Sequence, residues 1–407
     1  MRRIRGGRKA AIVFLAGTAL VSTSLGLVGG IPAHAAGVNT ATVVVGAIAS
    51  EEGSTNTTQD VPNALSRWQT YVNSTGGIGG HHVKVIVMND NNDPALSLTE
   101  AQTLVNQDHA VAILDQSSAD QAFEKFVDSR NIPVISENES AGTFTYLSDK
   151  NYFADGTTVL AILWGTLQAA RSQGAHNFGI VYCTDVSACA QAVPVLKGDA
   201  KALGMVVGYT AGASDSAPDY TAQCEAAQQA GVQALFPAGV GVTRMADDCA
   251  RQGYHPIWIG SEGTINATAA ADPNLNGAIS DQQGFPWFIN TTKATKLFHQ
   301  VMGSYLAHAE SPGALAADWT GAQMFGRALQ LGVALTPRQP VTAHTIYDGL
   351  YAFHGETLGG ITSPLTFSRT MPNQVNCWFL VGVHNKRYYA PRGLTPQCEP
   401  ASASSSS

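Results

Sequence analysis

The sequence is poor in charged residues and lacks the short motifs that mark many enzymes. Charged residues make up 13% of the chain. The six cysteines include no Cys-x-x-Cys pair, the spacing that zinc and redox sites favour. There is no Gly-x-Ser-x-Gly elbow, no Lys-Ser/Thr after a glycine-rich turn, and no two-His-plus-acid spacing among the eleven histidines. We therefore expect no enzyme activity, no metal and no cofactor.

Basic residues are also in the minority. The chain has 23 Lys and Arg against 30 Asp and Glu, which gives a net charge of −7. The first 35 positions hold five of the basic residues and none of the acidic ones, so the rest of the chain carries −12. A chain this acidic is a poor partner for nucleic acid or an anionic lipid surface, and we expect it to bind neither.

The first 35 residues follow the pattern of a signal peptide. A basic start (residues 2–9) precedes an apolar stretch (residues 10–28), and Ala33-His34-Ala35 supplies the small residues that a signal peptidase needs. Cleavage before Ala36 would place the protein in the periplasm or at the extracellular face of the cell envelope, or secrete it. The alternative is a retained membrane anchor, although the apolar stretch is barely long enough to span. No cysteine lies near the cleavage site, which argues against a lipid anchor.

The cysteines of an exported chain are expected to form disulfides. Sequence alone leaves fifteen pairings open for six cysteines. Proximity favours three of these bonds: Cys183 with Cys189, Cys224 with Cys249, and Cys377 with Cys398.

Strand and helix patterns alternate along the chain in two blocks. In the first block, short apolar runs predict strands at residues 41–47, 83–88, 111–114 and 132–135, with amphipathic helices between them. The second block repeats the pattern, with strands at residues 178–182, 205–209, 234–237 and 256–259. This alternation is typical of an α/β fold, and two blocks indicate two lobes. Three helices, strands at residues 364–367 and 377–383, and a disordered Ser-rich tail (401–407) are predicted to follow.

One stretch, residues 111–142, combines a strand, a helix and a second strand. The two strands should pair in parallel through a right-handed crossover. Ligands of open parallel sheets bind outside the carboxyl ends of the strands. Polar loops follow both strands here, with the sequences Asp115-Gln116-Ser117-Ser118 and Ser136-Glu137-Asn138-Glu139-Ser140. These two loops predict one wall of a binding site.

Four short motifs occur in a fixed order along the chain. They are Gly76-Gly77-Ile78-Gly79-Gly80 with the strand and Asp-rich turn that follow, Ser117-Ser118, Gly260-Ser261-Glu262-Gly263, and a Gly-Gly to Pro-Leu-x-Phe segment at residues 359–367. The ordered set resembles the branched-chain amino acid (Leu/Ile/Val) binding proteins of ABC importers. The resemblance covers nearly the whole chain after the signal peptide.

This resemblance implies the type I periplasmic binding fold, an α/β fold of two doubly wound parallel-sheet lobes joined by three crossing strands. The crossings would lie near residues 152–155, 279–281 and 362–367. The first lobe would comprise residues 38–154 and 282–362, and the second residues 155–281 and 363–400. Hinge closure would trap a ligand between the lobes.

The resemblance also implies ligand contacts at the strand ends of the first lobe. Ser117 and Ser118 would donate hydrogen bonds to a ligand carboxylate. For Ser118 the alternative is a helix-capping box with Gln121. Ser140 and the backbone of Glu139 lie where the family holds the α-carboxylate and α-ammonium groups of the ligand.

Further candidates lie at a crossing and on the second lobe. Asp155 lies at the first predicted crossing. Glu262 matches the family's acid that pairs with the ligand ammonium, and its alternative role is that of an exposed loop residue. Ser187 stands where the family often has a ligand-stacking tyrosine, a departure from the pattern. Glu137 and Glu139 are a second departure, so either these side chains point to solvent or the ligand carries extra positive charge.

The resulting hypothesis is an exported, monomeric solute-binding protein. It would capture a small polar, amino-acid-like ligand and deliver it to an ABC permease in the membrane. The alternative, from another class, is a secreted ligand sensor or interaction module that keeps the fold without a transport role. A secreted hydrolase is a more distant option.

Overall fold

A computed structural model of the chain describes residues 41–50, 60–136, 145–185, 187–261, 268–309 and 311–400. The predicted signal peptide and the predicted disordered tail lie outside these ranges. Within them, no helix is both long enough and apolar enough to cross a membrane.

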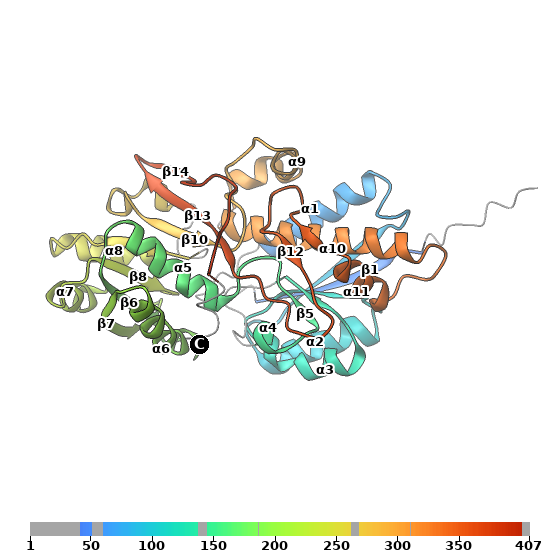
Figure 1. Ribbon diagram of the computed structural model, residues 1–407, viewed down its shortest axis with the longest axis horizontal. Helices are drawn as coiled ribbons and strands as arrows, with labels where there is room; N and C mark the ends of the chain where they lie inside the picture. Colours follow the sequence, from blue (N-terminus) through green and yellow to red (C-terminus); the bar gives the residue numbers. More distant parts are fainter. Residues whose placement is uncertain are drawn as a thin grey trace, which may run out of the picture. The chain divides into compact units, whose positions relative to one another are not determined.

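Five strands form a parallel sheet in the first part of the chain (Figure 1). Their order across the sheet is β2-β1-β3-β4-β5. The parallel pairing predicted for the strands of residues 111–135 is confirmed, with Ile113 opposite Val134. Because all five strands run in the same direction, their carboxyl ends meet at one edge. The bounds are β1 Val43–Ala49, β2 Val83–Asn89, β3 Ile113–Gln116, β4 Val134–Ile135 and β5 Tyr152–Phe153.

Helices cover both faces of this first sheet. Helices α1 and α10 pack together on one face, whereas α2 and α3 lie on the other (Figure 1). The rings of Trp68 in α1 and Phe325 in α10 meet edge to face, with 6.2 Å between their centroids. Residues beyond position 290 therefore complete the core that the first 150 residues begin. The bounds are α1 Asp60–Ser74, α2 Pro94–Asn106, α3 Glu124–Arg130, α4 Thr145–Ser148, α9 Lys293–Met302, α10 Pro312–Leu335 and α11 Ala343–Tyr351.

Side-chain caps decide where several of these helices begin. The carboxylate of Asp93 accepts hydrogen bonds from the amides of Ala95 and Leu96, and Pro94 occupies the first turn of α2. This helix consequently starts at Pro94. Helices α9 and α11 each begin with a capping box between two threonines.

A second sheet has the strand order β14-β13-β10-β9-β8-β6-β7, and β15 pairs with β13. Strands β6 to β10 are parallel, whereas β13 runs antiparallel to β10. The bounds are β6 Asn177–Cys183, β7 Val206–Ala213, β8 Ala234–Ala238, β9 Ile257–Gly260, β10 Ile279–Gln282, β13 Cys377–His384, β14 Arg387–Tyr389 and β15 Gln397–Cys398.

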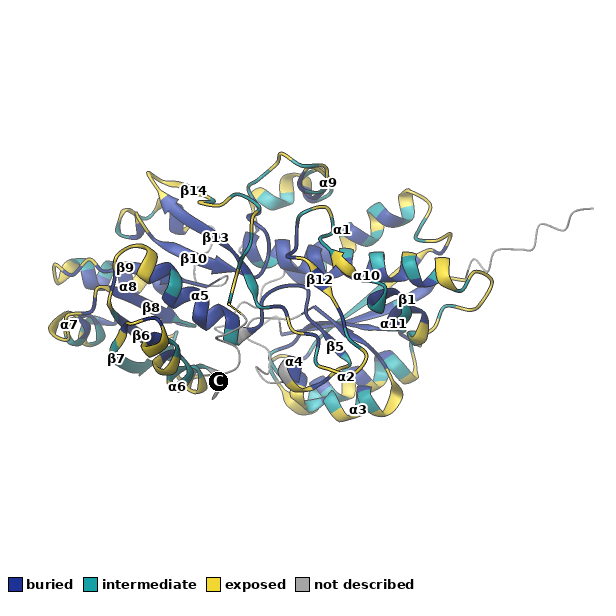
Figure 2. Cartoon of the chain, in the orientation of Figure 1, coloured by how far each residue is buried: buried dark blue, intermediate teal, exposed yellow. Residues whose placement is uncertain are grey.

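This second sheet separates two hydrophobic cores. Ile180 packs in the core that holds α5 (Val159–Ser172) and α6 (Ser187–Ala202). Its neighbour Val181 packs in the core that holds α7 (Thr221–Gln229) and α8 (Val242–Arg251). Successive side chains of a strand point to opposite faces, so a strand covered on both faces is apolar at every position. Figure 2 shows the central strands of this sheet as buried.

The chain passes from one sheet to the other three times: between β5 and α5, between β10 and α9, and between β12 and β13. The first two predicted crossings thus include strand β5 of the first sheet and strand β10 of the second. The third, at residues 362–367, contains β12 (Leu365–Thr366), which pairs antiparallel with β11 (His354–Glu356) in a small sheet of its own.

The three disulfides that proximity favoured are confirmed. All of them belong to the second sheet and its helices. Cys183 at the end of β6 bonds to Cys189 in α6. The other two bonds join α7 to α8 through Cys224–Cys249 and β13 to β15 through Cys377–Cys398.

Candidate ligand-binding site

Ser50, Asp90 and Ser117 form a hydrogen-bond network at the carboxyl edge of the first sheet. They follow strands β1, β2 and β3, and all three are buried. The hydroxyl of Ser50 donates to Oδ1 of Asp90 at 2.7 Å, and the hydroxyl of Ser117 donates to Oδ2. One carboxylate therefore ties three strand ends together.

The hydroxyl group of Ser117 is used within this network. Its oxygen accepts a hydrogen bond from the amide of Ala119 at 2.9 Å, and its O–H group donates a hydrogen bond to Asp90. Asp90 also accepts from the amide of Asn92 at 2.9 Å. Both oxygens of the Asp90 carboxylate are therefore engaged by hydrogen bonds, which hold the Ser117 hydroxyl in place. In this arrangement Ser117 has no spare proton for a ligand.

Ser118 differs from its neighbour in that its side chain has hydrogen-bonding capacity to spare. Its amide donates to Oγ of Ser50 at 2.9 Å, which connects it to the network. Its own hydroxyl is buried and meets no hydrogen-bond partner among the described residues. The alternative capping box with Gln121 does not form, because the short 3₁₀ helix Asp120–Ala122 begins after Ala119 with no side-chain cap.

Asp115 lies within the sheet rather than in the loop that follows it. The structured strand runs two residues further than predicted, so Asp115 is part of β3 and is fully buried. Burial and the nearby charge of Asp120 raise the pKa of its carboxyl well above the usual value. The hydroxyl of Tyr146 in α4 donates to Oδ2 of Asp115 at 3.2 Å. Asp115 therefore keeps its proton to a higher pH than an exposed aspartate.

Asp155 is buried two residues after β5, close to helix α10. The amide of Gln283, on the second connection between the sheets, donates to its Oδ1 at 3.4 Å. A Cβ atom at Gly321 of α10 would lie 2.6 Å from Oγ of Ser136 and 3.3 Å from Oδ2 of Asp155. The glycine therefore allows α10 to approach the ends of β4 and β5.

Of the seven predicted contact residues, the structure places the side chains of Ser117, Ser118 and Asp155. All three lie after strands of the first sheet. Glu139, Ser140 and Glu262 lie outside the described residues. For Ser187 the backbone is placed at the start of α6, but its side chain lies outside what is described. The wall that the second lobe was predicted to supply stays a prediction.

Sequence reasoning missed the parts that Ser50, Asp90 and Tyr146 play at this edge. Ser50 and Asp90 each follow a predicted strand, and this position alone was a usable signal. Tyr146 had no such signal, because the four-residue helix α4 shows no periodic pattern. The described part of the chain contains no cluster of three His, Cys, Asp or Glu that could hold a metal ion.

Solved structures with the same architecture share little sequence with this chain. A branched chain amino acid ABC transporter from Thermus thermophilus with bound valine is 14% identical, with a TM-score of 0.76 over 88% of this chain and 97% of that one. A fatty acid ABC transporter substrate-binding protein from Thermomonospora curvata is 19% identical, with a TM-score of 0.71 over 87% and 92%. A solute-binding protein from R. palustris in complex with benzoate is 16% identical, with a TM-score of 0.69 over 88% and 98%.

These similarities confirm the expected fold class, the α/β type I periplasmic binding protein fold with two parallel-sheet lobes. No curated protein sequence matches the chain. The family model of the periplasmic binding proteins matches residues 42–387, which is most of the chain. The chain therefore belongs to the periplasmic binding protein family.

Proposed function

We propose that the protein is the solute-binding component of an ABC importer, a non-catalytic receptor that captures a small polar ligand by hinge closure. Family membership supports a binding role, and the similar structures from Thermus thermophilus and Thermomonospora curvata are named as ABC transporter proteins. One observation carries the proposal. The hydroxyl of Ser118, without a partner in the described part of the chain, is held at the strand-end edge where parallel sheets bind ligands.

The ligand that we propose carries an ammonium group, as an amino acid does. Asp90 and Asp155 are both buried along this edge. A cationic group would be attracted to these carboxyls, whereas a ligand with only a carboxylate would be repelled. Among the three similar structures, one has bound valine, one is named for a fatty acid and one is in complex with benzoate. An amino acid such as valine is therefore the ligand class that we propose for this protein.

Each candidate residue then has a specific role. The hydroxyl of Ser118 donates a hydrogen bond to the ligand carboxylate. Ser117 helps to position Ser118 through the network that contains Asp90. Asp155 faces the ammonium group. The remaining contacts come from Glu139, Ser140, Ser187 and Glu262.

The two proposed hinged bodies are residues 38–154 with 282–362, and residues 155–281 with 363–400. The connections between the two sheets support this division, since they provide three points at which the bodies can bend. Closure would bring Glu262 on the second body against Ser118 on the first.

Calorimetric titration against amino acids, polyamines and small organic acids tests the proposal. For the amino acid that binds best, Ser118→Ala should weaken binding roughly tenfold, because a hydrogen bond to a charged group is lost. Ser129→Ala is the matched control, since this exposed hydroxyl bonds only to the Phe126 carbonyl of its own helix. If Ser118→Ala binds the amino acid with unchanged affinity, Ser118 does not contact the ligand. If benzoate binds tightly and no amino acid does, the proposed amino-acid ligand class is wrong.

The transport role needs a separate experiment in cells. Deleting the gene should abolish high-affinity uptake of the ligand found by titration, and the wild-type gene should restore it. Uptake that continues unchanged would favour the alternative of a secreted sensor.

A further inference from the structure

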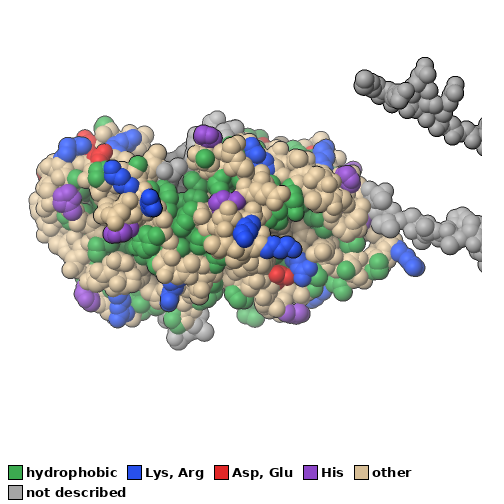
Figure 3. Space-filling view, turned by 90° about the horizontal axis from the view of Figure 1, so that it is seen from above, with side chains coloured by type: hydrophobic (Ala, Val, Ile, Leu, Met, Phe, Trp, Pro, Cys, Tyr) green, Lys and Arg blue, Asp and Glu red, His purple; other side chains and the backbone are tan. Residues whose placement is uncertain are grey.

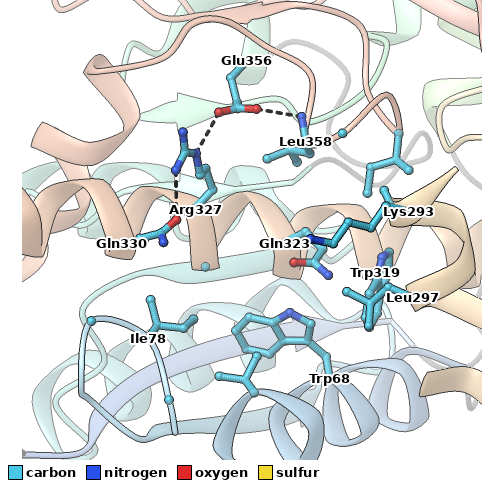
Figure 4. Close-up of a pocket in the computed structure, with 17 residues that line it drawn as sticks. Trp68, Ile78, Lys293, Leu297, Trp319, Gln323, Arg327, Gln330, Glu356 and Leu358 are labelled. Atoms are coloured by element: carbon cyan, nitrogen blue, oxygen red, sulfur yellow. Dashed lines mark hydrogen bonds and ion pairs between the residues drawn. The ribbon is translucent and has the colours of Figure 1, made fainter. Parts of the chain in front are cut away.

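We propose a second binding site among the helices that cover the first sheet. It is a pocket that fits a small carboxylate with an apolar body. The pocket has a volume of about 510 Å³, within the range of small-molecule sites. It lies between α1 and α10, and the glycine-rich turn at residues 76–80 and the start of α9 complete it (Figure 4). That turn precedes β2, so the pocket lies toward the amino edge of the sheet and shares no residue with the site around Ser118.

The floor of the pocket is aromatic and contains unused hydrogen-bond donors. Trp68 and Trp319 are 1% and 0% exposed. Neither indole N–H has a hydrogen-bond partner among the described residues. Figure 4 shows the nitrogen of Trp68 on the edge of the ring that faces the pocket. Buried donors without an acceptor are costly, so a ligand oxygen would bind them favourably once a small side-chain movement exposes them to the pocket.

The rim of the pocket carries a net positive charge. Nε of Arg327 donates to Oε2 of Glu356 at 2.8 Å. The amides of Thr357 and Leu358 donate to the other oxygen of Glu356. Burial opposes ionisation of Glu356, but these hydrogen bonds outweigh it and lower the pKa of its carboxyl. Glu356 therefore neutralises Arg327 and leaves the ammonium of Lys293 as the excess charge.

Lys293 is a charged residue in a chain that has few of them, since charged residues make up only 13% of the sequence, with an excess of acids. On the face drawn in Figure 3, Lys and Arg side chains are more in evidence than Asp and Glu. In Figure 4 the side chain of Lys293 extends toward Gln323, on the side of the pocket opposite Trp68. One positive charge above an aromatic floor fits one carboxylate with an aromatic or short aliphatic body.

Binding of 3-phenylpropionate, with its neutral amide as the comparison, tests this site by calorimetry and tryptophan fluorescence. The carboxylate should bind and the amide should bind at least about tenfold more weakly, since a charge-assisted hydrogen bond is lost. Lys293→Met should weaken the carboxylate to the level of the amide. The matched control is Lys296→Met, an exposed lysine one turn away on α9 that does not line the pocket.

Two further variants separate this pocket from the edge site. Ala294→Leu, which fills the pocket from its wall, should abolish binding of the carboxylate. Ser118→Ala should leave it unchanged. The proposal is overturned if neither probe binds at millimolar concentration, if Lys293→Met binds the carboxylate as the wild type does, or if Ser118→Ala removes the binding instead.

Discussion

Burial raises the pKa of two carboxyl groups, those of Asp199 and Glu399. Asp199 is half-buried on α6, and burial raises the pKa of its carboxyl from 3.8 to about 6. Burial, and then the nearby charge of Asp199, also raise the pKa of Glu399. These two acids lie away from the strand-end edge, so their ionisation affects stability without touching the proposed ligand.

The Asp199→Asn variant should be more stable than the wild type above pH 6 and equally stable near pH 4. A carboxyl with a raised pKa stabilises the folded state below its unfolded pKa and loses this contribution as the pH rises through about 6. A two-unit shift corresponds to about 3 kcal/mol in full. Solvent screening of a half-buried group reduces the expected gain to about 1 kcal/mol.

Urea denaturation between pH 4 and pH 8 measures this difference. Glu225→Gln, which removes one negative charge from the exposed surface of α7, is the control. A gain for Asp199→Asn that is the same at every pH would show that ionisation is not its cause.

Single residues were harder to predict than their positions. The order of polar residues after β3 identified Ser118, since any residue directly after a parallel strand lies at the ligand edge. The partners of Ser117, Ser118 and Asp115 could not be predicted. Asp90, Ser50 and Tyr146 come from distant segments that meet these residues only in the folded chain. A two-residue error in the bounds of β3 was enough to move Asp115 from the loop into the sheet.

At the scale of elements, α10 depends on small residues where it passes the strand ends. Gly321→Ala should destabilise the protein by about 1 to 3 kcal/mol, because the new methyl would overlap the side chain of Ser136. It should also weaken ligand binding by displacing Asp155. Thermal and chemical unfolding measure the first effect, and calorimetry measures the second.

A glycine-to-alanine change in another helix is the matched control. Gly198 in α6 has open space around its Cβ position. Gly198→Ala should therefore stabilise the protein by about 0.5 to 1 kcal/mol through higher helix propensity. If Gly321→Ala also stabilised the protein, the close approach of α10 would be wrong.

Periodicity predicted the long elements and missed several of the short ones. The helices have apolar patterns of seven or more residues, and the central strands have buried apolar runs. Both patterns identify the type of secondary structure with little ambiguity. Strands β11, β14 and β15 have two or three residues each, too few to show any alternation. The 3₁₀ turn before α3 was likewise missed, since nothing in the sequence pattern between β3 and β4 marks a break in the single helix predicted there.

At the scale of the whole molecule, the disulfides are distributed unevenly. All three lie in the second sheet and its helices, and the first sheet has none. We call the first sheet with its helices the first half, and the second sheet with its helices the second half. Replacing Cys224 and Cys249 with alanine removes their disulfide and should lower the free energy of unfolding of the second half by about 3 kcal/mol, as expected for a loop of this length. The first half should keep its own stability.

Hydrogen exchange read by mass spectrometry distinguishes the two halves. Amides of β6 and β8 should lose protection in the variant, whereas those of β1 and β3 should not. Equal loss in both sheets would show that the halves unfold as one unit.

The class of fold and the disulfide pairs were predictable from the sequence because they follow from pattern and spacing. The lobe boundaries stay a proposal.

The pairing of α1 with α10 has a consequence for export. A chain that leaves a translocation pore from its N-terminus presents β1 to β5 long before α10, so one apolar face of the first sheet is at first uncovered. Strands β6 to β10 and helices α5 to α8 then emerge without interruption and supply most of both of their cores, to which β13 later adds Trp378, Leu380 and Val383. We expect the half that is synthesised later to fold first, and the earlier half to need a chaperone while it waits. A chain ended at residue 290 should accordingly form the Cys224–Cys249 bond while Trp68 stays open to solvent, which fluorescence quenching would detect.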